Sequence, residues 1–382
     1  MNRLVKQIIY MAPGAIETVQ SLLDDRAARS VFVVADRTAY DKSGAKMYIE
    51  SGLQGRGHAI FDDFAPNPKY ADVVRGVKFW HTHPGDIMIA IGGGSAIDMA
   101  KLIGICGTHR DQYRELLTGN IPIRDKVAPL IAIPTTAGTG SEATHFAVVY
   151  VGEQKYSVAH ANVLPDYAII DPNLTANLPP SITAHTGLDA LSQAVESLWS
   201  VNATAQSRVF ASEALELVLD NLEAAVHRPT PDVRANMCRA AHLSGKAINI
   251  SKTTAPHAIS YTLTSQFGVP HGLAVALTLG AVLIYNNRVV SGDCWHPKGV
   301  AQVQKDIREI NRLIGVASSE EARKYIDDLI SAIGCPTRLR QVGVDTDADL
   351  ETLAQNVNTE RLKNNPRALS QFELRQILRE IH

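Results

Sequence analysis

The segment GDIMIAIGGGSAIDMAKLIG, Gly85–Gly104, contains the pattern that decides the fold. An apolar run leads into three successive glycines, and a second apolar run of helical length follows them. We therefore predict a buried strand, a tight turn and a helix that begins at the turn. Glycines let backbone N–H groups approach a phosphate, and a helix N-terminus favours negative charge. The turn is either structural or phosphate-binding, and it lacks the GxGxxG spacing of the standard Rossmann fingerprint.

Three further apolar runs resemble this strand, at Ser30–Asp36, Pro129–Thr136 and Tyr167–Pro172. They alternate with segments of helical periodicity. Buried strands that alternate with helices are typical of a parallel sheet covered by helices on both faces. The N-terminal half is therefore predicted to be an α/β domain.

A second polar loop, PTTAGTGSE at Pro134–Glu142, follows one of these strands. It is either an ordinary polar loop or a partner of the glycine turn. Two such loops at the carboxyl ends of strands in one sheet indicate a shared crevice for a nucleotide. Asp36 ends another strand, where an acid can accept hydrogen bonds from an adenosine ribose, although aspartate also commonly begins turns. Arg37 follows it directly and complicates any preference for NAD over NADP.

The pattern changes to helical spacing in the second half, as in Ala203–Val226. The double proline at Pro179–Pro180 is the predicted boundary. We expect an α/β dinucleotide-binding domain over residues 1–178 and an all-helical domain for metal and substrate over residues 179–382.

Composition restricts the possible partners. The chain of 382 residues has a formal net charge of −2, so no global field attracts nucleic acid or an anionic membrane. Its four cysteines lack CxxC spacing, which favours free thiols in a reducing compartment. The N-terminus has no signal-peptide pattern and no window is long and apolar enough to span a membrane. We expect a soluble cytoplasmic protein.

A candidate metal site follows from the histidines. The segment His185–Ser197 is predicted to be helical, which places His185, Asp189 and Gln193 on one face. Together with His257 and His271 they form a set of nitrogen and oxygen ligands that suits Fe²⁺, Zn²⁺, Ni²⁺ or Mn²⁺. The alternative is that each histidine is a hydrogen-bonded core or surface residue.

Five ordered motifs carry a family resemblance: GGGSAIDMAK, IPTTAGTGSEAT, LPDYAIIDPNLT, GLDALSQAVES and GVPHG. Together they resemble the iron-containing (group III) alcohol dehydrogenases. The resemblance implies NAD(P)H, a divalent metal such as Fe²⁺ or Zn²⁺, and a homodimer. It implies cofactor contacts at Asp36, Asn67, Gly93, Gly94, Ser95, Asp98, Thr135, Thr136, Thr139 and Lys155. It implies metal ligands at Asp189, Gln193, His257 and His271.

The sequence departs from the family pattern at two positions. Gln193 stands where the family usually has a histidine ligand, and an amide oxygen is a poorer ligand than imidazole for borderline metals. The metal affinity is lower, the preferred metal is different, or the site is empty. Tyr261 stands where many members carry a further histidine, often assigned to proton relay, so the relay here uses Tyr261 or water.

The stretch SKTTAPHA, Ser251–Ala258, resembles the phosphonoacetaldehyde reductase (hydroxyethylphosphonate dehydrogenase) branch of the family. Lys252, Thr253 and Thr254 are suited to hold an anionic group beside a metal, although a surface lysine at a helix end is the alternative. We therefore predict reduction of a small anionic aldehyde, with phosphonoacetaldehyde to 2-hydroxyethylphosphonate as the specific hypothesis. Other substrates of the family, a dehydroquinate-synthase-like cyclase and a nucleotide-binding homologue without metal remain the alternatives.

Overall fold

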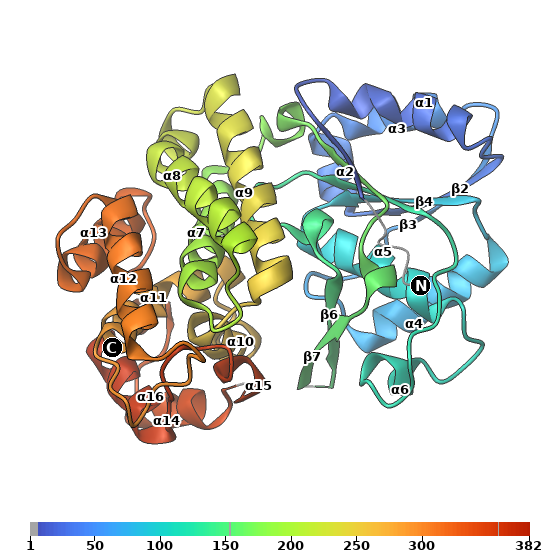
Figure 1. Ribbon diagram of the computed structural model, residues 1–382. Helices are drawn as coiled ribbons and strands as arrows, with labels where there is room; N and C mark the ends of the chain where they lie inside the picture. Colours follow the sequence, from blue (N-terminus) through green and yellow to red (C-terminus); the bar gives the residue numbers. More distant parts are fainter. Residues whose placement is uncertain (1–6, 153, 358) are drawn as a thin grey trace. The chain divides into compact units, whose positions relative to one another are not determined.

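The computed structural model describes residues 7–152, 154–357 and 359–382. The chain divides into two compact units, Met1–Leu178 and Pro179–His382, and the division falls at the double proline. The first unit is an α/β structure and the second is helical, which confirms the predicted fold class (Figure 1).

The first unit is built on a six-stranded parallel sheet with strand order β1-β8-β5-β4-β2-β3. Its strands are β1 Ile8–Met11, β2 Ser30–Ala35, β3 Gly57–Phe61, β4 Ile87–Gly92, β5 Leu130–Pro134 and β8 Tyr167–Ile170. Four of these strands were expected from their apolar runs, and the short edge strands β1 and β3 were not. The edge strands lack a continuous buried run because one side of each has no neighbouring strand.

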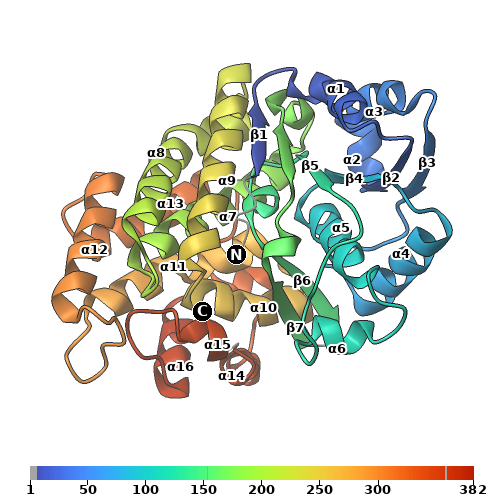
Figure 2. The same ribbon diagram turned by 45° about the vertical axis from the view of Figure 1, so that its right-hand side comes forward.

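Helices cover both faces of this sheet (Figure 2). They are α1 Thr18–Asp25, α2 Arg37–Lys42, α3 Ala45–Leu53, α4 Tyr70–Thr82, α5 Gly94–Cys106 and α6 Tyr113–Leu117. Alternate residues of one strand enter different cores, because successive side chains point to opposite faces. On β4, Ile89 packs with residues of α1 and α3, whereas Met88 and Ala90 pack with α4 and α5. The strands are therefore buried on both sides, as their continuous apolar runs predict.

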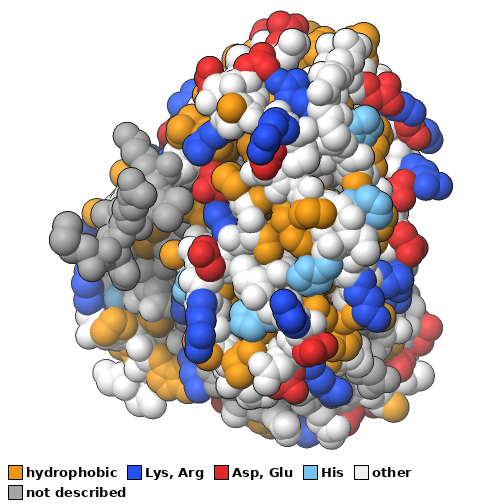
Figure 3. Space-filling model, turned by 90° about the vertical axis from the view of Figure 1, so that its right-hand side faces the viewer, with side chains coloured by type: hydrophobic (Ala, Val, Ile, Leu, Met, Phe, Trp, Pro, Cys, Tyr) orange, Lys and Arg blue, Asp and Glu red, His pale blue; other side chains and the backbone are white. Residues whose placement is uncertain are grey.

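An antiparallel hairpin of β6 Phe146–Val151 and β7 Gln154–Ala159 follows the second polar loop. Sequence reasoning did not predict it, because apolar and polar residue types do not alternate along FAVVYV or QKYSVA, although the burial of β6 does alternate. The hairpin is attached to the segment before α4 through a hydrogen bond from Tyr150 N to Pro68 O of 2.8 Å. Charged side chains of both signs are mixed over the face of the molecule drawn in Figure 3, in keeping with the near-neutral net charge.

The second unit consists of helices. They are α7 Pro180–Trp199, α8 Ala205–His227, α9 Pro231–Ser251, α10 Ala255–Phe267, α11 His271–Asn287, α12 Val300–Ile314, α13 Ser319–Ala332, α14 Asp347–Gln355, α15 Thr359–Leu362 and α16 Gln371–Glu380. Helix α7 packs against α8, α9 and α11, so it occupies the centre of the unit. Among the described residues, no helix is both long and apolar enough to cross a membrane.

Candidate metal centre and nucleotide loops

The two polar loops of the first unit pack against each other. Strands β4 and β5 are neighbours in register, with Gly92 opposite Pro134, so both loops leave the same end of the sheet. A side chain at Gly94 would place its Cβ 2.8 Å from the Thr139 hydroxyl oxygen. A Cβ at Gly93 would lie 3.4 Å from the Thr136 hydroxyl oxygen. The glycines therefore keep open a cradle of backbone and hydroxyl groups that a Cβ would fill, which suits a phosphate group.

Other predicted cofactor residues lie beside this cradle. The backbone N–H of Asn67 donates to the Ser95 hydroxyl over 3.0 Å, with Asn67 at φ 60°. A Cβ at Gly92 would lie 3.0 Å from the Cβ of Asp36, so β2 ends at the same place. The Thr135 hydroxyl is buried and has no hydrogen-bond partner among the described residues. The structure thus brings these predicted residues to one end of the sheet.

Asp36 and Lys155 have identifiable roles in the fold. The Asp36 side chain accepts from the Ala39 N–H over 2.9 Å and caps α2, which is the turn-forming role that the sequence left open. Arg37 is paired with Asp62 at 2.7 Å. Lys155 lies on the hairpin, with its ammonium 5.8 Å from the centre of the Tyr150 ring.

Asp98, a predicted cofactor contact, also has hydrogen bonds within the fold. One carboxylate oxygen accepts from the Ser141 hydroxyl, and the other accepts from the Val148 N–H over 2.9 Å. Both oxygens therefore connect α5 to the second loop and the hairpin. The cofactor contact at Asp98 stays a prediction, and the long-range partners Ser141 and Val148 could not be found from the sequence.

Lys101, one turn further along α5, is a residue that sequence reasoning missed. Its buried ammonium donates to the carbonyl oxygens of Ser141 and Phe146 over 2.6 and 2.8 Å, and to the Thr144 hydroxyl over 3.1 Å. Burial lowers the pKa of Lys101 to about 8, against the attraction of Asp98. Lysine is rarely fully buried without partners. Here the hydrogen bonds of the Lys101 ammonium hold the end of the second loop in place.

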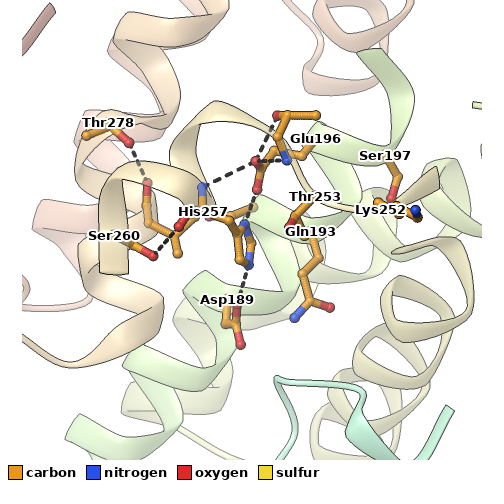
Figure 4. Close-up of polar contacts among 12 residues, drawn as sticks. Asp189, Gln193, Glu196, Ser197, Lys252, Thr253, His257, Ser260 and Thr278 are labelled. Atoms are coloured by element: carbon orange, nitrogen blue, oxygen red, sulfur yellow. Dashed lines mark hydrogen bonds and ion pairs between the residues drawn. The ribbon is translucent and has the colours of Figure 1, made fainter. Parts of the chain in front are cut away.

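The candidate metal ligands come from three helices of the second unit, and Figure 4 shows two of them, Asp189 and His257. Asp189 lies on α7, His257 on α10, and His271 is the first residue of α11. The Asp189 Oδ1 is 3.3 Å from the His257 Nε2 and 4.0 Å from the His271 Nε2. The three ligand atoms lie within 4.8 Å of one another. The two histidines thus lie on two different helices.

The other nitrogen of each imidazole is already engaged. The His257 Nδ1 contacts the carboxylate of Glu196, and the His271 Nδ1 is 3.5 Å from the Ser260 hydroxyl. Metal-binding histidines commonly have such a partner, which sets the tautomer and the ring orientation. Both Nε2 atoms are therefore the ones directed at Asp189.

Electrostatics in this cluster favour a cation. Burial alone lowers the pKa of His257, but the carboxylates of Glu196 and Asp189 outweigh it and raise the pKa to about 9. Burial alone raises the pKa of Asp189, but its interactions with His257 and His271 outweigh this and lower the pKa. The Asp189 Oδ1 is buried and has no well-directed hydrogen bond among the described residues, although the His257 Nε2 lies 3.3 Å away. A carboxylate oxygen with an unsatisfied lone pair beside two imidazole nitrogens fits a divalent metal such as Fe²⁺ or Zn²⁺.

Glu196 is the second residue that sequence reasoning missed. It is fully buried on α7, and one of its oxygens accepts from the N–H and the hydroxyl of Thr254, each over 2.8 Å. Helix α10 has no cap from its own N-cap side chain, so this carboxylate serves as the cap from another helix. In the sequence, the only indication of this role was an acidic residue seven positions after Asp189. Glu196 thus fixes both the start of α10 and the orientation of His257.

Gly272 lets α11 approach α7 closely. A Cβ at Gly272 would lie 1.9 Å from the carbonyl oxygen of His185 and 2.9 Å from the backbone nitrogen of Asp189. Only glycine permits this separation, which brings His271 next to Asp189. The side chain of His185 is not part of the metal cluster, although the predicted helical face included it.

Gln193 and Tyr261 each lie one helical turn after a candidate metal ligand. Gln193 is buried one turn after Asp189, and its amide oxygen is 3.0 Å from the Ser244 hydroxyl. Gln193 also interacts with the Asp189 carboxylate, which helps to lower the pKa of Asp189. Tyr261 lies on α10 one turn after His257 and is partly exposed.

The turn before α10 holds Lys252 in an unusual backbone conformation. Its φ is 61° and its ψ is 168°, a region that glycine adopts and other residues avoid. The neighbouring backbone is firmly held, since Ser200 donates to the Ser251 carbonyl over 2.6 Å and Asn364 donates to the Thr253 carbonyl over 2.9 Å. The Lys252 side chain is exposed and has no hydrogen-bond or ion-pair partner among the described residues.

The two threonines of this turn do not form the predicted polar cradle. Both are buried, with Thr253 at 5% and Thr254 at 0% exposure. The Thr254 hydroxyl accepts from the Trp199 indole N–H over 2.8 Å and donates to Glu196. Of the three predicted residues, only Lys252 extends into solvent, and in Figure 4 it lies to the side of the pair His257 and Asp189.

Comparison with known families and proteins agrees with this geometry. Residues 6–172 match the profile of the iron-containing alcohol dehydrogenases, and residues 183–382 match the C-terminal profile of the same family. The 1,3-propanediol dehydrogenase of Klebsiella pneumoniae is 32% identical over 99% of this chain and 97% of its own length.

Two similar proteins have names that refer to charged aldehydes. The phosphonoacetaldehyde reductase of Streptomyces viridochromogenes is 34% identical over 77% of this chain and 76% of its own length. The crystal structure of sulfoacetaldehyde reductase from Bifidobacterium kashiwanohense, in complex with NAD⁺, has a TM-score of 0.88 and 29% identity, covering 98% of this chain and 96% of that one.

Proposed function

Because the chain belongs to the iron-containing alcohol dehydrogenase family, we propose that it uses NADH to reduce a small anionic aldehyde to the primary alcohol. Membership makes the chain an NAD(P)-dependent, metal-containing oxidoreductase that acts on small aldehydes or alcohols. The specific proposal is the reduction of phosphonoacetaldehyde to 2-hydroxyethylphosphonate. In that reaction the carbonyl carbon gains a hydride and the oxygen gains a proton, while NADH becomes NAD⁺.

The site residues have the following proposed roles. Asp189, His257 and His271 hold the metal, with Gln193 or water as a further ligand. The glycine cradle and Thr136, Thr139, Asn67 and Ser95 hold the cofactor phosphates and sugars. When bound, the metal supplies Lewis-acid chemistry toward a carbonyl oxygen, and the nicotinamide supplies the hydride. Tyr261, one turn after His257, is placed on the same side of α10 to pass a proton directly or through water.

The observation that carries the substrate proposal is the conformation of Lys252. A non-glycine residue in this region costs about 1–3 kcal/mol, and such strain is concentrated at functional sites. The ammonium at the end of this strained turn has no partner among the described residues, five positions before a metal ligand. Lys252 precedes α10, the helix that carries His257, and an exposed ammonium there is suited to a phosphonate, sulfonate or carboxylate group. The names of two similar proteins, which refer to phosphonoacetaldehyde and sulfoacetaldehyde, support the same substrate class.

The test is a panel of short aldehydes assayed by NADH consumption. The purified protein is loaded with Fe²⁺ or Zn²⁺ and given phosphonoacetaldehyde, sulfoacetaldehyde and a neutral aldehyde of equal length. We expect a higher kcat/KM for the anionic aldehydes. The variant Lys252→Ala should lose about tenfold in kcat/KM on them, because solvent screening places an exposed charge-assisted hydrogen bond at the low end of its range. Activity on the neutral aldehyde should stay unchanged.

The control variant is Lys298→Ala, which removes another exposed lysine of the same unit. It should leave both activities intact. Equal losses on charged and neutral aldehydes in Lys252→Ala would assign the lysine a structural role and remove the basis for an anionic substrate. NADH consumption in proportion to substrate also separates a reductase from a cyclase, which recycles its NAD internally.

Location and assembly are further parts of this proposal. All four cysteines are free thiols, which supports a cytoplasmic location. We propose a homodimer, and light scattering on the purified protein measures its mass directly.

A further inference from the structure

We infer that Ser244 is a positioning residue that allows the Gln193 amide to turn its oxygen toward a bound metal. This inference rests on the metal site of the proposed function. Gln193 lies one turn after Asp189 on α7, and Ser244 faces it from α9. The Ser244 hydroxyl oxygen is 3.0 Å from the Gln193 Oε1 and 2.9 Å from the carbonyl oxygen of Ala241. Both side chains are buried, so water does not replace either contact.

A serine hydroxyl has one proton, so it can donate to only one of these two oxygens at a time. In the structure Ser244 donates to the Gln193 Oε1, which leaves the amide nitrogen as the end that faces Asp189. Figure 4 shows the nitrogen end of this amide on the side of Asp189. In this orientation an N–H group, and not an oxygen, faces the Asp189 carboxylate.

The opposite orientation is equally well hydrogen-bonded at Ser244. If its proton goes to the Ala241 carbonyl, the hydroxyl oxygen accepts from the Gln193 amide nitrogen. The amide oxygen then faces the Asp189 side, where a cation attracts it and would repel the N–H group. The terminal torsion of glutamine is soft, so the exchange requires no movement of the helices. A hydroxyl can both donate and accept, and for this reason it supports both orientations.

The consequence for the metal is a site with two imidazole nitrogens and two oxygen atoms from side chains. Compared with a third imidazole at position 193, an amide oxygen shifts the ligand set toward metals that prefer oxygen, such as Mn²⁺, and away from Zn²⁺. Ser244 therefore influences both how tightly the site binds and which metal it selects.

The experiment measures the Kd of Mn²⁺ alone by calorimetry on the full chain after removal of bound metal. Ser244→Ala should weaken Mn²⁺ binding by about 10- to 100-fold, the usual loss when the partner of a ligand is removed. In Ser244→Ala the methyl group cannot accept from the Gln193 N–H, so the metal-bound orientation has an unsatisfied N–H. The opposite orientation has an unsatisfied Gln193 Oε1 instead, which is tolerated better than an unsatisfied N–H. The same substitution in a Gln193→Met background should cause no further loss, because no amide remains to be oriented.

The matched control is Ser192→Ala. Ser192 is a buried serine on α7 whose hydroxyl donates only to the Leu188 carbonyl of its own helix, over 2.8 Å. Its removal should leave the Kd unchanged. Circular dichroism checks that each variant is folded, and Ser244→Cys carries the same test if Ser244→Ala is not folded, since a thiol is a poor hydrogen-bonding group of similar size.

Three outcomes overturn the inference. Unchanged Mn²⁺ binding in Ser244→Ala shows that the hydroxyl does not orient the amide. An equal loss in the Gln193→Met background shows that Ser244 acts independently of Gln193. A wild-type chain that takes up no Mn²⁺, Fe²⁺ or Zn²⁺ overturns the metal site itself and the inference with it. By contrast, metal uptake with the expected Ser244 effect but no aldehyde reduction contradicts only the proposed function.

Discussion

Replacement of Lys252 by glycine should stabilise the protein, because the backbone at this position has a conformation suited to glycine. The φ of 61° and ψ of 168° lie in a region that costs a residue with a side chain about 1–3 kcal/mol. Glycine removes this cost but has a more flexible unfolded chain, which offsets about 0.5–1 kcal/mol. The lysine side chain is exposed and has no hydrogen bond or ion pair among the described residues to lose. We therefore expect Lys252→Gly to increase the free energy of unfolding of the helical unit by about 0.5–2 kcal/mol.

The thermal unfolding of the metal-free protein is measured by calorimetry. A unit of this size shifts its Tm by about 2–4 °C per kcal/mol, so the expected increase is about 1–8 °C. Lys252→Ala is the reference, since alanine retains a Cβ and therefore the strain. It should stay within about 0.5 kcal/mol of the wild type, as surface substitutions usually do.

The comparison of the two variants decides the interpretation. If Lys252→Gly is no more stable than Lys252→Ala, the backbone at this position is not strained and the argument for a functional lysine loses its energetic basis. Both variants should lose the preference for anionic aldehydes, because both lack the ammonium. A gain in stability together with that loss is the expected signature of strain that is retained for function.

Three further predictions follow from the contacts at the two sites. Gly272→Ala should abolish metal binding and lower the free energy of unfolding by about 1–3 kcal/mol or more, because the Cβ of the alanine would lie 1.9 Å from the His185 carbonyl oxygen. Metal content measures the first effect and calorimetry measures the second. Glu196→Gln should weaken metal binding by about 10- to 100-fold. If the new amide caps α10 with its oxygen, its N–H groups point at the His257 Nδ1, and the imidazole proton moves to the Nε2 that faces the metal. A metal affinity equal to that of the wild type would contradict this prediction. Asp36 should make NADH preferred over NADPH, because a carboxylate repels the 2′-phosphate of NADPH. In Asp36→Ser the kcat/KM values for NADH and NADPH should be closer to each other. Equal kcat/KM values for the two cofactors in the wild type would show that Asp36 does not discriminate between them.

Local sequence patterns were sufficient for most of the fold. The strand, turn and helix around Gly85–Gly104 were predicted, and the structure has β4 at Ile87–Gly92 and α5 at Gly94–Cys106. Apolar periodicity and glycine turns depend on neighbours within a few residues, so they can be read without knowledge of the tertiary structure. The hairpin β6–β7 was missed because residue types do not alternate along its sequence, and its strands are stabilised by each other and by the segment at Pro68.

The motifs of the sequence also identified the main candidate ligands, but they did not reveal the residues that orient them. Asp189, His257 and His271 carry ligand atoms, so their residue types alone point to metal chemistry. Glu196 and Ser244 have common residue types and act through partners that are far away in the sequence. Glu196 contacts a histidine 61 positions away, and Ser244 contacts an amide 51 positions away.

The sequence by itself determined the α/β and helical halves, the glycine turn and the residue types of a metal site, because these depend on local periodicity and on chemistry carried by single side chains. Only the tertiary structure decided that Thr254 is buried against Glu196, that Asp98 fastens a loop, and that Lys252 adopts a conformation of glycine. These features arise where two segments distant in the chain are packed together, and the hydrogen bonds and backbone angles at such contacts are set by the packing of whole helices.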